Sequence, residues 1–137
     1  MKDTTEKLLR SNNLKATPAR ISILTFLEKK KVPVDVTEVE AYLKSRKIKM
    51  NQSTVYRILN AFVDNRLVKR IEFQEGKSRY ELSSLPHHHH VVCIKCGAIE
   101  DVTYRGKESL ERLFASKSSF IIQSHNLEFF GLCARCQ

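Results

Sequence analysis

The chain has 137 residues, of which 42% are hydrophobic and 28% are charged, and it contains no run of about 18 apolar residues that could span a bilayer. Residues 1–10 carry charges of both signs and lack the apolar core of a secretory signal, so we expect a cytoplasmic protein. The net charge of +9 is uneven, because residues 1–83 hold 18 Lys and Arg against 10 Asp and Glu, whereas residues 84–137 hold 6 against 5. The positive charge of residues 1–83 fits either a polyanion-binding surface or a solvated lysine-rich one.

The chain is predicted to begin with two helices. The first is a short helical segment that ends near Ser11. Thr17 can then cap a second helix that has Pro18 at its first position, where a missing amide proton costs nothing. The apolar face that follows predicts that this helix covers residues 18–30.

Two further helices are predicted before any strand. Thr37 and Glu40 have the spacing of a capping box, in which each side chain satisfies a free backbone amide, and this predicts a helix over residues 37–46. Apolar residues at helical spacing across residues 55–63 predict a helix that begins near Ser53. Its outer face is polar and able to form hydrogen bonds.

A β-hairpin is predicted after the helices. Residues 67–73 and 79–82 have the composition of strands, and residues 74–77 join them. Gly76 in this connection can supply a positive φ angle. Helices followed by a basic hairpin are the order of a winged helix-turn-helix, in which one helix enters the major groove of DNA.

The pattern changes after a hinge at residues 83–86. Strands are predicted at residues 88–94 and 98–102, a helix at residues 107–115, and a third and fourth strand within residues 120–132. The chain is therefore predicted to be an α+β protein, with a winged helix-turn-helix domain over residues 1–83 and a small α/β domain over residues 84–137.

Four cysteines form two pairs, each with two residues between its members: Cys93 and Cys96, and Cys133 and Cys136. Such a pair places two thiolates across a tight turn, and two pairs complete the tetrahedron of a closed structural zinc site. Gly97 helps the backbone turn beneath the ion. Buried or redox-active cysteines are the alternative. Four thiolates would leave no open position for catalysis.

Four consecutive histidines, His87 to His90, lead directly into an apolar strand and Cys93. Because side chains alternate along a strand, His88 and His90 are expected on one face and His87 and His89 on the other, which allows two metal sites. A tag remnant or a solvated, hydrogen-bonded cluster is the alternative. Further ligands must come from elsewhere, and the candidates are Glu81, Asp101, Glu108 and His125.

Five segments in this order resemble the ferric uptake regulator family over nearly the whole chain. They are Leu14-Lys-Ala-Thr-Pro-Ala-Arg20, Ser53-Thr-Val-Tyr-Arg-Ile-Leu-Asn60, Gly76-Lys-Ser-Arg-Tyr-Glu-Leu82, the histidine run with Cys93-x-x-Cys96-Gly97, and residues 125–136. The resemblance implies a homodimeric repressor that binds an AT-rich inverted repeat through residues 1–83. Residues 84–137 would dimerise and bind a structural Zn²⁺ and a regulatory Fe²⁺, Zn²⁺ or Mn²⁺.

The resemblance also implies roles for individual DNA-binding residues. Tyr56 would meet thymine methyl groups and base edges, and Lys15 would enter the narrow minor groove of AT-rich DNA. Phosphates or neighbouring bases would be contacted by Arg20, Ser53, Thr54 and Arg57.

The same resemblance implies two regulatory metal sites. One would be formed by His87, His89, Glu108 and His125, and the other by Glu81, His88, His90 and Asp101. Two residues depart from the family pattern. His89 replaces a common aspartate, which favours zinc while still permitting iron. Pro33 replaces a histidine that links the two domains, and this leaves Glu81 as the ligand from the first domain.

Two other functions are alternatives to a regulator. A metal-dependent hydrolase would need an open ligand position, and no serine, cysteine or glutamate stands out as an additional nucleophile or base; we therefore expect no enzyme. A zinc-stapled interaction or metal-storage protein without sequence-specific DNA binding is the other alternative, and footprinting on DNA would separate it from a repressor.

Overall fold

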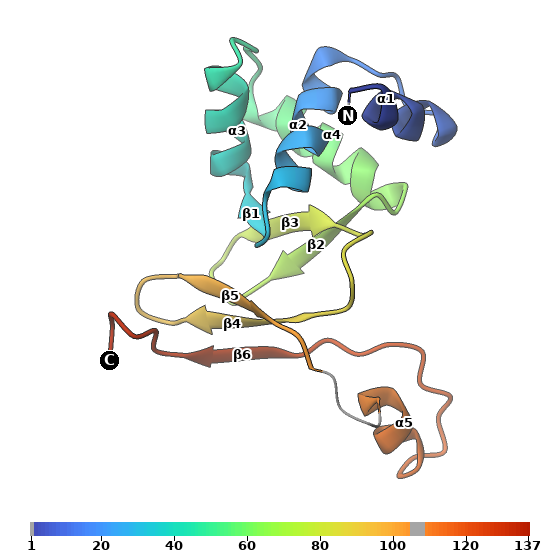
Figure 1. Cartoon of the computed structure of the whole chain (residues 1–137), viewed down its shortest axis with the longest axis vertical. Coiled ribbons are helices and arrows are strands. Elements are labelled where there is room, and N and C mark those ends of the chain that lie inside the picture. The colour runs from blue at the N-terminus through green and yellow to red at the C-terminus, as the bar shows by residue number, and fades with distance from the viewer. Residues whose placement is uncertain (1, 105–108) are drawn as a thin grey trace. The chain divides into compact units, whose positions relative to one another are not determined.

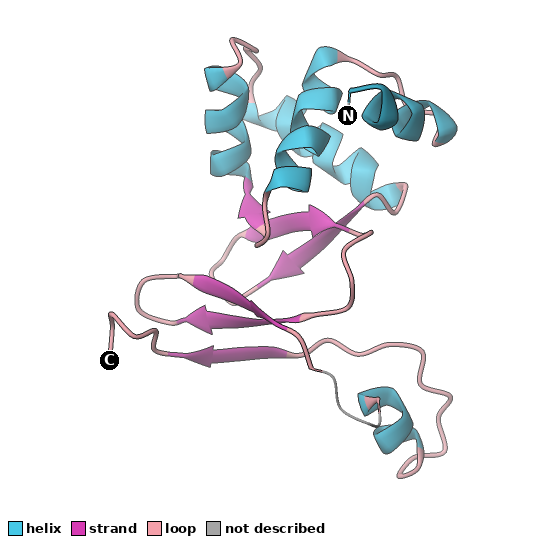
Figure 2. Cartoon of the chain, in the orientation of Figure 1, coloured by secondary structure: helices cyan, strands magenta, loops and turns pink. Residues whose placement is uncertain are grey.

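The computed structural model describes residues 2–104 and 109–137. It divides into two compact units, Met1–Leu85 and Pro86–Gln137, which are described separately below. Figure 2 distinguishes their helices, strands and loops. No helix within the described ranges is long and apolar enough to cross a membrane.

The first unit contains four helices and a small antiparallel sheet (Figure 1). The helices are α1 (Lys2–Ser11), α2 (Pro18–Lys29), α3 (Val36–Ser45) and α4 (Gln52–Asp64), and the strands are β1 (Val34–Asp35), β2 (Val68–Glu72) and β3 (Ser78–Leu82). The strand order is β1-β3-β2, with Tyr80 opposite both Val34 and Arg70. This arrangement confirms the predicted winged helix-turn-helix.

Apolar side chains from every helix and from the sheet form one core in this unit. Leu24 of α2, Val39 of α3, and Leu59 and Phe62 of α4 are fully buried within it. Because burial is confined to one face of α4, the opposite face remains available to a partner.

Side-chain caps fix where the helices begin. Thr17 caps α2 as predicted, since its Oγ1 accepts a hydrogen bond from the Arg20 amide at 3.3 Å. The predicted capping box at Thr37 and Glu40 is wrong. The box is formed by Asp35 and Glu38: the side-chain carboxylate of each residue accepts a hydrogen bond from the backbone amide of the other, both at 2.9 Å. Helix α3 therefore starts with Val36. Asp35 sits at the end of β1 with an extended backbone, which is the conformation that a cap requires.

The hairpin turn depends on two positive φ angles and on ion pairs. Gly76 has φ of 75°, as expected, and Gln74 has φ of 60°. Arg79 donates two hydrogen bonds to the Glu75 carboxylate, both at 2.8 Å. Nζ of Lys77 lies 2.6 Å from Oδ2 of Asp35, the residue that caps α3. The tip of the hairpin is thereby tied to a helix of the same unit.

The second unit is built on a three-stranded mixed sheet (Figure 1). Its strands are β4 (His89–Cys93), β5 (Ile99–Val102) and β6 (Glu128–Gly131) in the order β5-β4-β6. β4 pairs antiparallel with β5 and parallel with β6. Helix α5 (Leu110–Ala115) lies between β5 and β6 in sequence. The predicted α+β class is confirmed.

Two predictions for this unit are corrected. Residues 120–132 contain one strand, β6, rather than two, because a parallel partner of β4 must be reached by a crossover and residues 120–127 form its last part. Helix α5 is shorter than predicted: Ser109 caps it, its Oγ accepting from the Arg112 amide at 3.2 Å. Residues 107 and 108 of the predicted helix lie outside the described residues.

Candidate metal centres and nucleic-acid interface

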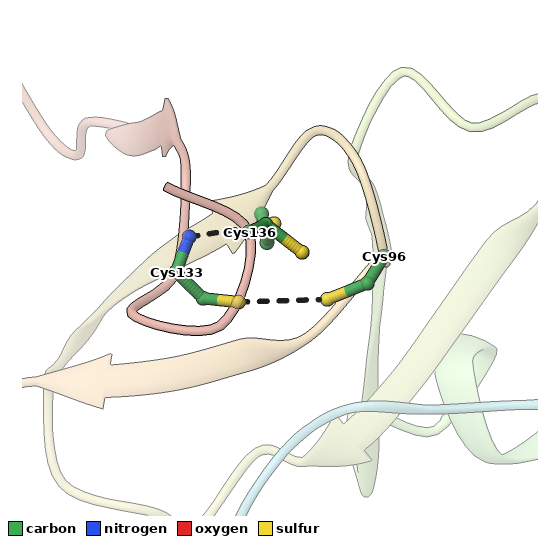
Figure 3. A group of neighbouring side chains, drawn as sticks. Cys96, Cys133 and Cys136 are labelled. Carbon is green, nitrogen blue, oxygen red and sulfur yellow. Dashed lines mark hydrogen bonds between the residues drawn. The ribbon is translucent and has the colours of Figure 1, made fainter.

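The sheet of the second unit brings the two cysteine pairs together. Because β4 and β6 are parallel, with Cys93 opposite Gly131, the turns that follow the two strands lie at the same end of the sheet. Cys133 follows two residues later, so 36 intervening residues do not separate the pairs in space. The four sulfur atoms lie within 4.8 Å of one another, and the Sγ atoms of Cys96 and Cys133 are 3.7 Å apart. Figure 3 shows these two side chains pointing toward each other.

Backbone amides surround this cluster of four free thiols. Gly97 has φ of 74° and donates its amide to the carbonyl oxygen of Cys93 at 2.9 Å, which closes the first turn. Hydrogen bonds from the backbone of Cys133 and Cys96 lower the pKa of Cys93 to about 6. The hydrogen bond with Cys133 raises the pKa of Cys136 to about 12. Neighbouring sulfurs thus compete for protons, and the four-thiolate set fits a tetrahedral Zn²⁺.

Three histidines converge on one face of β4. Ligand nitrogens of His87, His89 and His125 lie within 4.8 Å of one another. Burial, followed by the nearby His87 ring, lowers the pKa of His89 and so favours its neutral, metal-binding form. Nε2 of His125 is buried and has no hydrogen-bond partner among the described residues. A divalent cation fits these donors, because it would give that nitrogen a partner.

The structure places a carboxylate beside one of these histidines. Glu108 lies outside the described residues. Glu111 was not predicted, and its Oε1 accepts a hydrogen bond from Nδ1 of His125 at 2.6 Å. The serine cap at Ser109, which places Glu111 in the first turn of α5, is the sequence signal that could have identified it.

His88 and His90 project from the other face of β4. Their Nε2 atoms are 3.1 Å apart, and His88 donates Nδ1–H to the carbonyl oxygen of Pro86 at 2.6 Å. Asp101 stands opposite His90 in the β4–β5 register, with 3.5 Å between its Oδ1 and His90 Nε2. The imidazoles and this carboxylate are donors suited to zinc, iron or manganese. Glu81 lies on β3 of the first unit, with its side chain buried.

The residues predicted to contact DNA lie at two places in the first unit. Ser53, Tyr56 and Arg57 are exposed on α4, and Tyr56 retains 40% of its accessible surface. Thr54, on the same helix, is half-buried. Lys15 is exposed in the loop before α2, where Nη1 of Arg20 donates to its carbonyl oxygen at 3.2 Å.

A winged helix-turn-helix in one chain with a four-cysteine cluster and histidine clusters defines a metal-binding transcriptional regulator. The profile of the ferric uptake regulator family matches residues 11–130, and the chain belongs to this family of metal-responsive transcriptional regulators. The resemblance predicted from the sequence is thereby confirmed.

Individual relatives match this chain along nearly the whole length of both sequences. The chain is 32% identical over 138 residues to the ferric uptake regulation protein of Bacillus subtilis strain 168, covering 98% of this chain and 93% of that protein. The structure of the Vibrio cholerae ferric uptake regulator matches with a TM-score of 0.81 and 32% identity, covering 93% and 98% of the two chains. The iron-containing regulator from Francisella tularensis matches with a TM-score of 0.79 and 28% identity, covering 90% and 94%.

Proposed function

We propose that this protein is a homodimeric repressor that binds operator DNA when a regulatory divalent cation, Fe²⁺, Zn²⁺ or Mn²⁺, is bound. The observation that carries the proposal is the set of three imidazoles on one face of β4, one of which has a buried nitrogen with no partner among the described residues. A bound cation would shift the population toward a conformation in which two recognition helices fit successive half-sites.

Three groups of residues are proposed to bind metal. The four cysteines hold the structural Zn²⁺ and keep their unit folded. One regulatory ion is bound by His87, His89, Glu108 and His125, and a second by Glu81, His88, His90 and Asp101. The imidazole-rich composition of the first set favours zinc, and the carboxylates of the second also suit iron and manganese.

The DNA-binding roles are proposed for residues 1–83. Tyr56 reads thymine methyl groups and base edges, Lys15 enters the minor groove of an AT-rich inverted repeat, and Arg20, Ser53, Thr54 and Arg57 contact phosphates or neighbouring bases. The exposure of Lys15, Tyr56 and Arg57 supports these roles, as does the location of most of the net positive charge in this part of the chain.

Exposed apolar side chains support dimerisation through residues 84–137. Phe120 retains 77% of its accessible surface and Ile121 retains 91%, and the same unit exposes Ile94, Val102, Tyr104, Phe114, Phe129, Phe130 and Leu132. So much exposed apolar surface in one small unit is typical of an interface. A second copy of the chain related by two-fold symmetry would cover it.

A DNA-binding titration tests the proposal. Zinc-loaded full-length protein is treated with a mild chelator that leaves the cysteine-bound ion in place, and its affinity for the DNA upstream of its own gene is measured by fluorescence anisotropy. Added Fe²⁺, Mn²⁺ or Zn²⁺ is expected to tighten binding at fixed ionic strength, and His125→Ala to weaken that response. Equal affinity with and without the exchangeable ion would refute metal-dependent repression.

A further inference from the structure

The two ring nitrogens of His125 have different surroundings. Nδ1 lies 2.6 Å from Oε1 of Glu111, whereas Nε2 is buried without a hydrogen-bond partner among the described residues. The ring of His125 is 5.1 Å from that of His87 and 5.2 Å from that of His89, measured between centroids. One nitrogen is therefore held by a carboxylate while the histidine lies beside the two other imidazoles.

The carboxylate determines which nitrogen can bind a cation. A carboxylate accepts hydrogen bonds, so Nδ1 of His125 carries the proton and the lone pair of the neutral ring is on Nε2. The bonding directions of the two nitrogens diverge across the ring, so a carboxylate that accepts from Nδ1 lies away from an ion on Nε2. Consistent with this, the set of mutually close ligand atoms holds His87, His89 and His125 and does not include Glu111.

We propose that Glu111 is a positioning residue of the regulatory metal site. It selects the Nδ1–H tautomer of His125, fixes the orientation of the ring and makes Nε2 a stronger donor, while remaining outside the set of metal ligands. This inference rests on the proposed function of that site. It assigns different roles to two acidic residues that are three positions apart in the sequence, because Glu108 is proposed to bind the ion and Glu111 to hold a histidine that binds it.

Cobalt titration of full-length protein separates these roles. The protein carries His88→Ala and His90→Ala, which remove the imidazoles from the other face of β4, and retains zinc on its cysteines. Affinity for Co²⁺ and the visible absorption spectrum of the bound ion are measured, because the spectrum reports the ligand set. Glu111→Gln, Glu111→Ala, Glu108→Gln and His125→Ala are compared with Glu28→Gln, which removes an exposed carboxylate from α2.

Glu111→Gln is expected to weaken Co²⁺ binding about 10-fold with an unchanged spectrum, and Glu111→Ala to weaken it further, toward about 100-fold. The glutamine oxygen still accepts from Nδ1 but lacks the charge, which explains the graded loss. Glu108→Gln is expected to change the spectrum, because it replaces a ligand. Glu28→Gln should have no effect.

Unchanged affinity in both Glu111 variants would overturn the inference, as would a changed spectrum in Glu111→Gln, since Glu111 would then be a ligand itself. His125→Ala distinguishes this failure from failure of the proposed function. If His125→Ala binds Co²⁺ as tightly as the parent protein, the metal site itself is refuted. If it does not while the Glu111 variants bind normally, only the role of Glu111 is refuted.

Discussion

Glu75 and Asp35 are carboxylates that form ion pairs with the hairpin residues Arg79 and Lys77. The hydrogen bonds from Arg79 lower the pKa of Glu75 below its ordinary value of 4.5 in spite of partial burial. Burial raises the pKa of Asp35, but the hydrogen bonds from Lys77 and from the Glu38 backbone outweigh it, so this pKa also lies below its ordinary value of 3.8. Arg79 also donates to the carbonyl oxygen of Pro33 at 3.4 Å, so the same side chain holds the segment before β1.

These lowered pKa values predict acid sensitivity. A carboxyl whose pKa is lower in the folded state stabilises the fold above its unfolded pKa, and this contribution is lost as the pH falls through the folded pKa. The free energy of unfolding should therefore decrease as the pH falls below about 4.5, with a shallower decrease in Glu75→Gln. Urea unfolding of metal-free protein at several pH values measures this. Parallel pH dependences in the wild type and the variant would contradict it.

Single residues differ in how far the sequence could predict them. The period of two along a strand is enough to divide His87 and His89 from His88 and His90, and paired spacing is enough to indicate the cysteine cluster. Glu111 could not be found in this way. The Ser109 cap is a local signal that places Glu111 in the first turn of α5, but its position beside His125 also depends on the path of the crossover, which local spacing does not determine.

At the scale of elements, the start of α4 depends on Asn51. Its Oδ1 accepts hydrogen bonds from the Thr54 amide at 2.9 Å and from the hydroxyls of Ser53 at 2.8 Å and Thr54 at 2.7 Å. This side chain both caps the helix and holds two of the residues proposed to contact DNA. It was absent from the sequence-based prediction, in which the helix began near Ser53.

Substitution of Asn51 should separate folding from DNA binding. Asn51→Ala is expected to lower the free energy of unfolding by about 1 kcal/mol and to weaken DNA binding. Asn51→Asp retains an acceptor and should restore stability, but its negative charge beside phosphates should keep DNA affinity low. Thermal unfolding and fluorescence anisotropy measure the two effects. If Asn51→Asp binds DNA as the wild type does, Asn51 does not lie at the interface.

The elements differ in predictability for a physical reason. Helix α2 has a threonine cap, a proline at its first position and an apolar face, and these local signals agree. Strand β6 pairs with β4 across more than 30 residues, in parallel, so its pairing depends on tertiary structure that local spacing does not contain. The cap of α3 was misplaced because Asp35 and Thr37 both begin acceptable patterns, and only the strand geometry at Asp35 decides between them.

At the scale of the whole molecule, the two units rely on different sources of stability. The core cluster of buried apolar residues extends from Leu9 to Tyr80 in sequence, whereas the buried apolar residues of the second unit within the described ranges are Val92 and Cys93. A unit of this size with so few buried apolar groups needs a metal or a partner to remain folded.

Removal of the structural zinc should therefore unfold one unit and spare the other. Strong chelation under reducing conditions, or Cys133→Ser, is expected to abolish the proposed dimer and expose the second unit to protease, while the helical circular dichroism of the first unit persists. Size-exclusion chromatography, limited proteolysis and circular dichroism measure these changes. Loss of all structure in a single transition would show instead that the two units fold only together.

The uneven charge of the chain predicts how DNA binding should respond to salt. Each phosphate neutralised by a Lys or Arg releases counterions, so the logarithm of the affinity falls linearly with the logarithm of salt concentration, with a slope of about 0.9 for each contact. Arg57→Ala should reduce this slope by about one contact in each protomer and weaken binding to specific and unrelated DNA alike.

Tyr56→Ala should instead lower the preference for operator DNA and leave the slope unchanged, because a phenol ring displaces no counterion. Anisotropy titrations at several salt concentrations measure both slopes, and an unaltered slope in Arg57→Ala would remove Arg57 from the phosphate contacts.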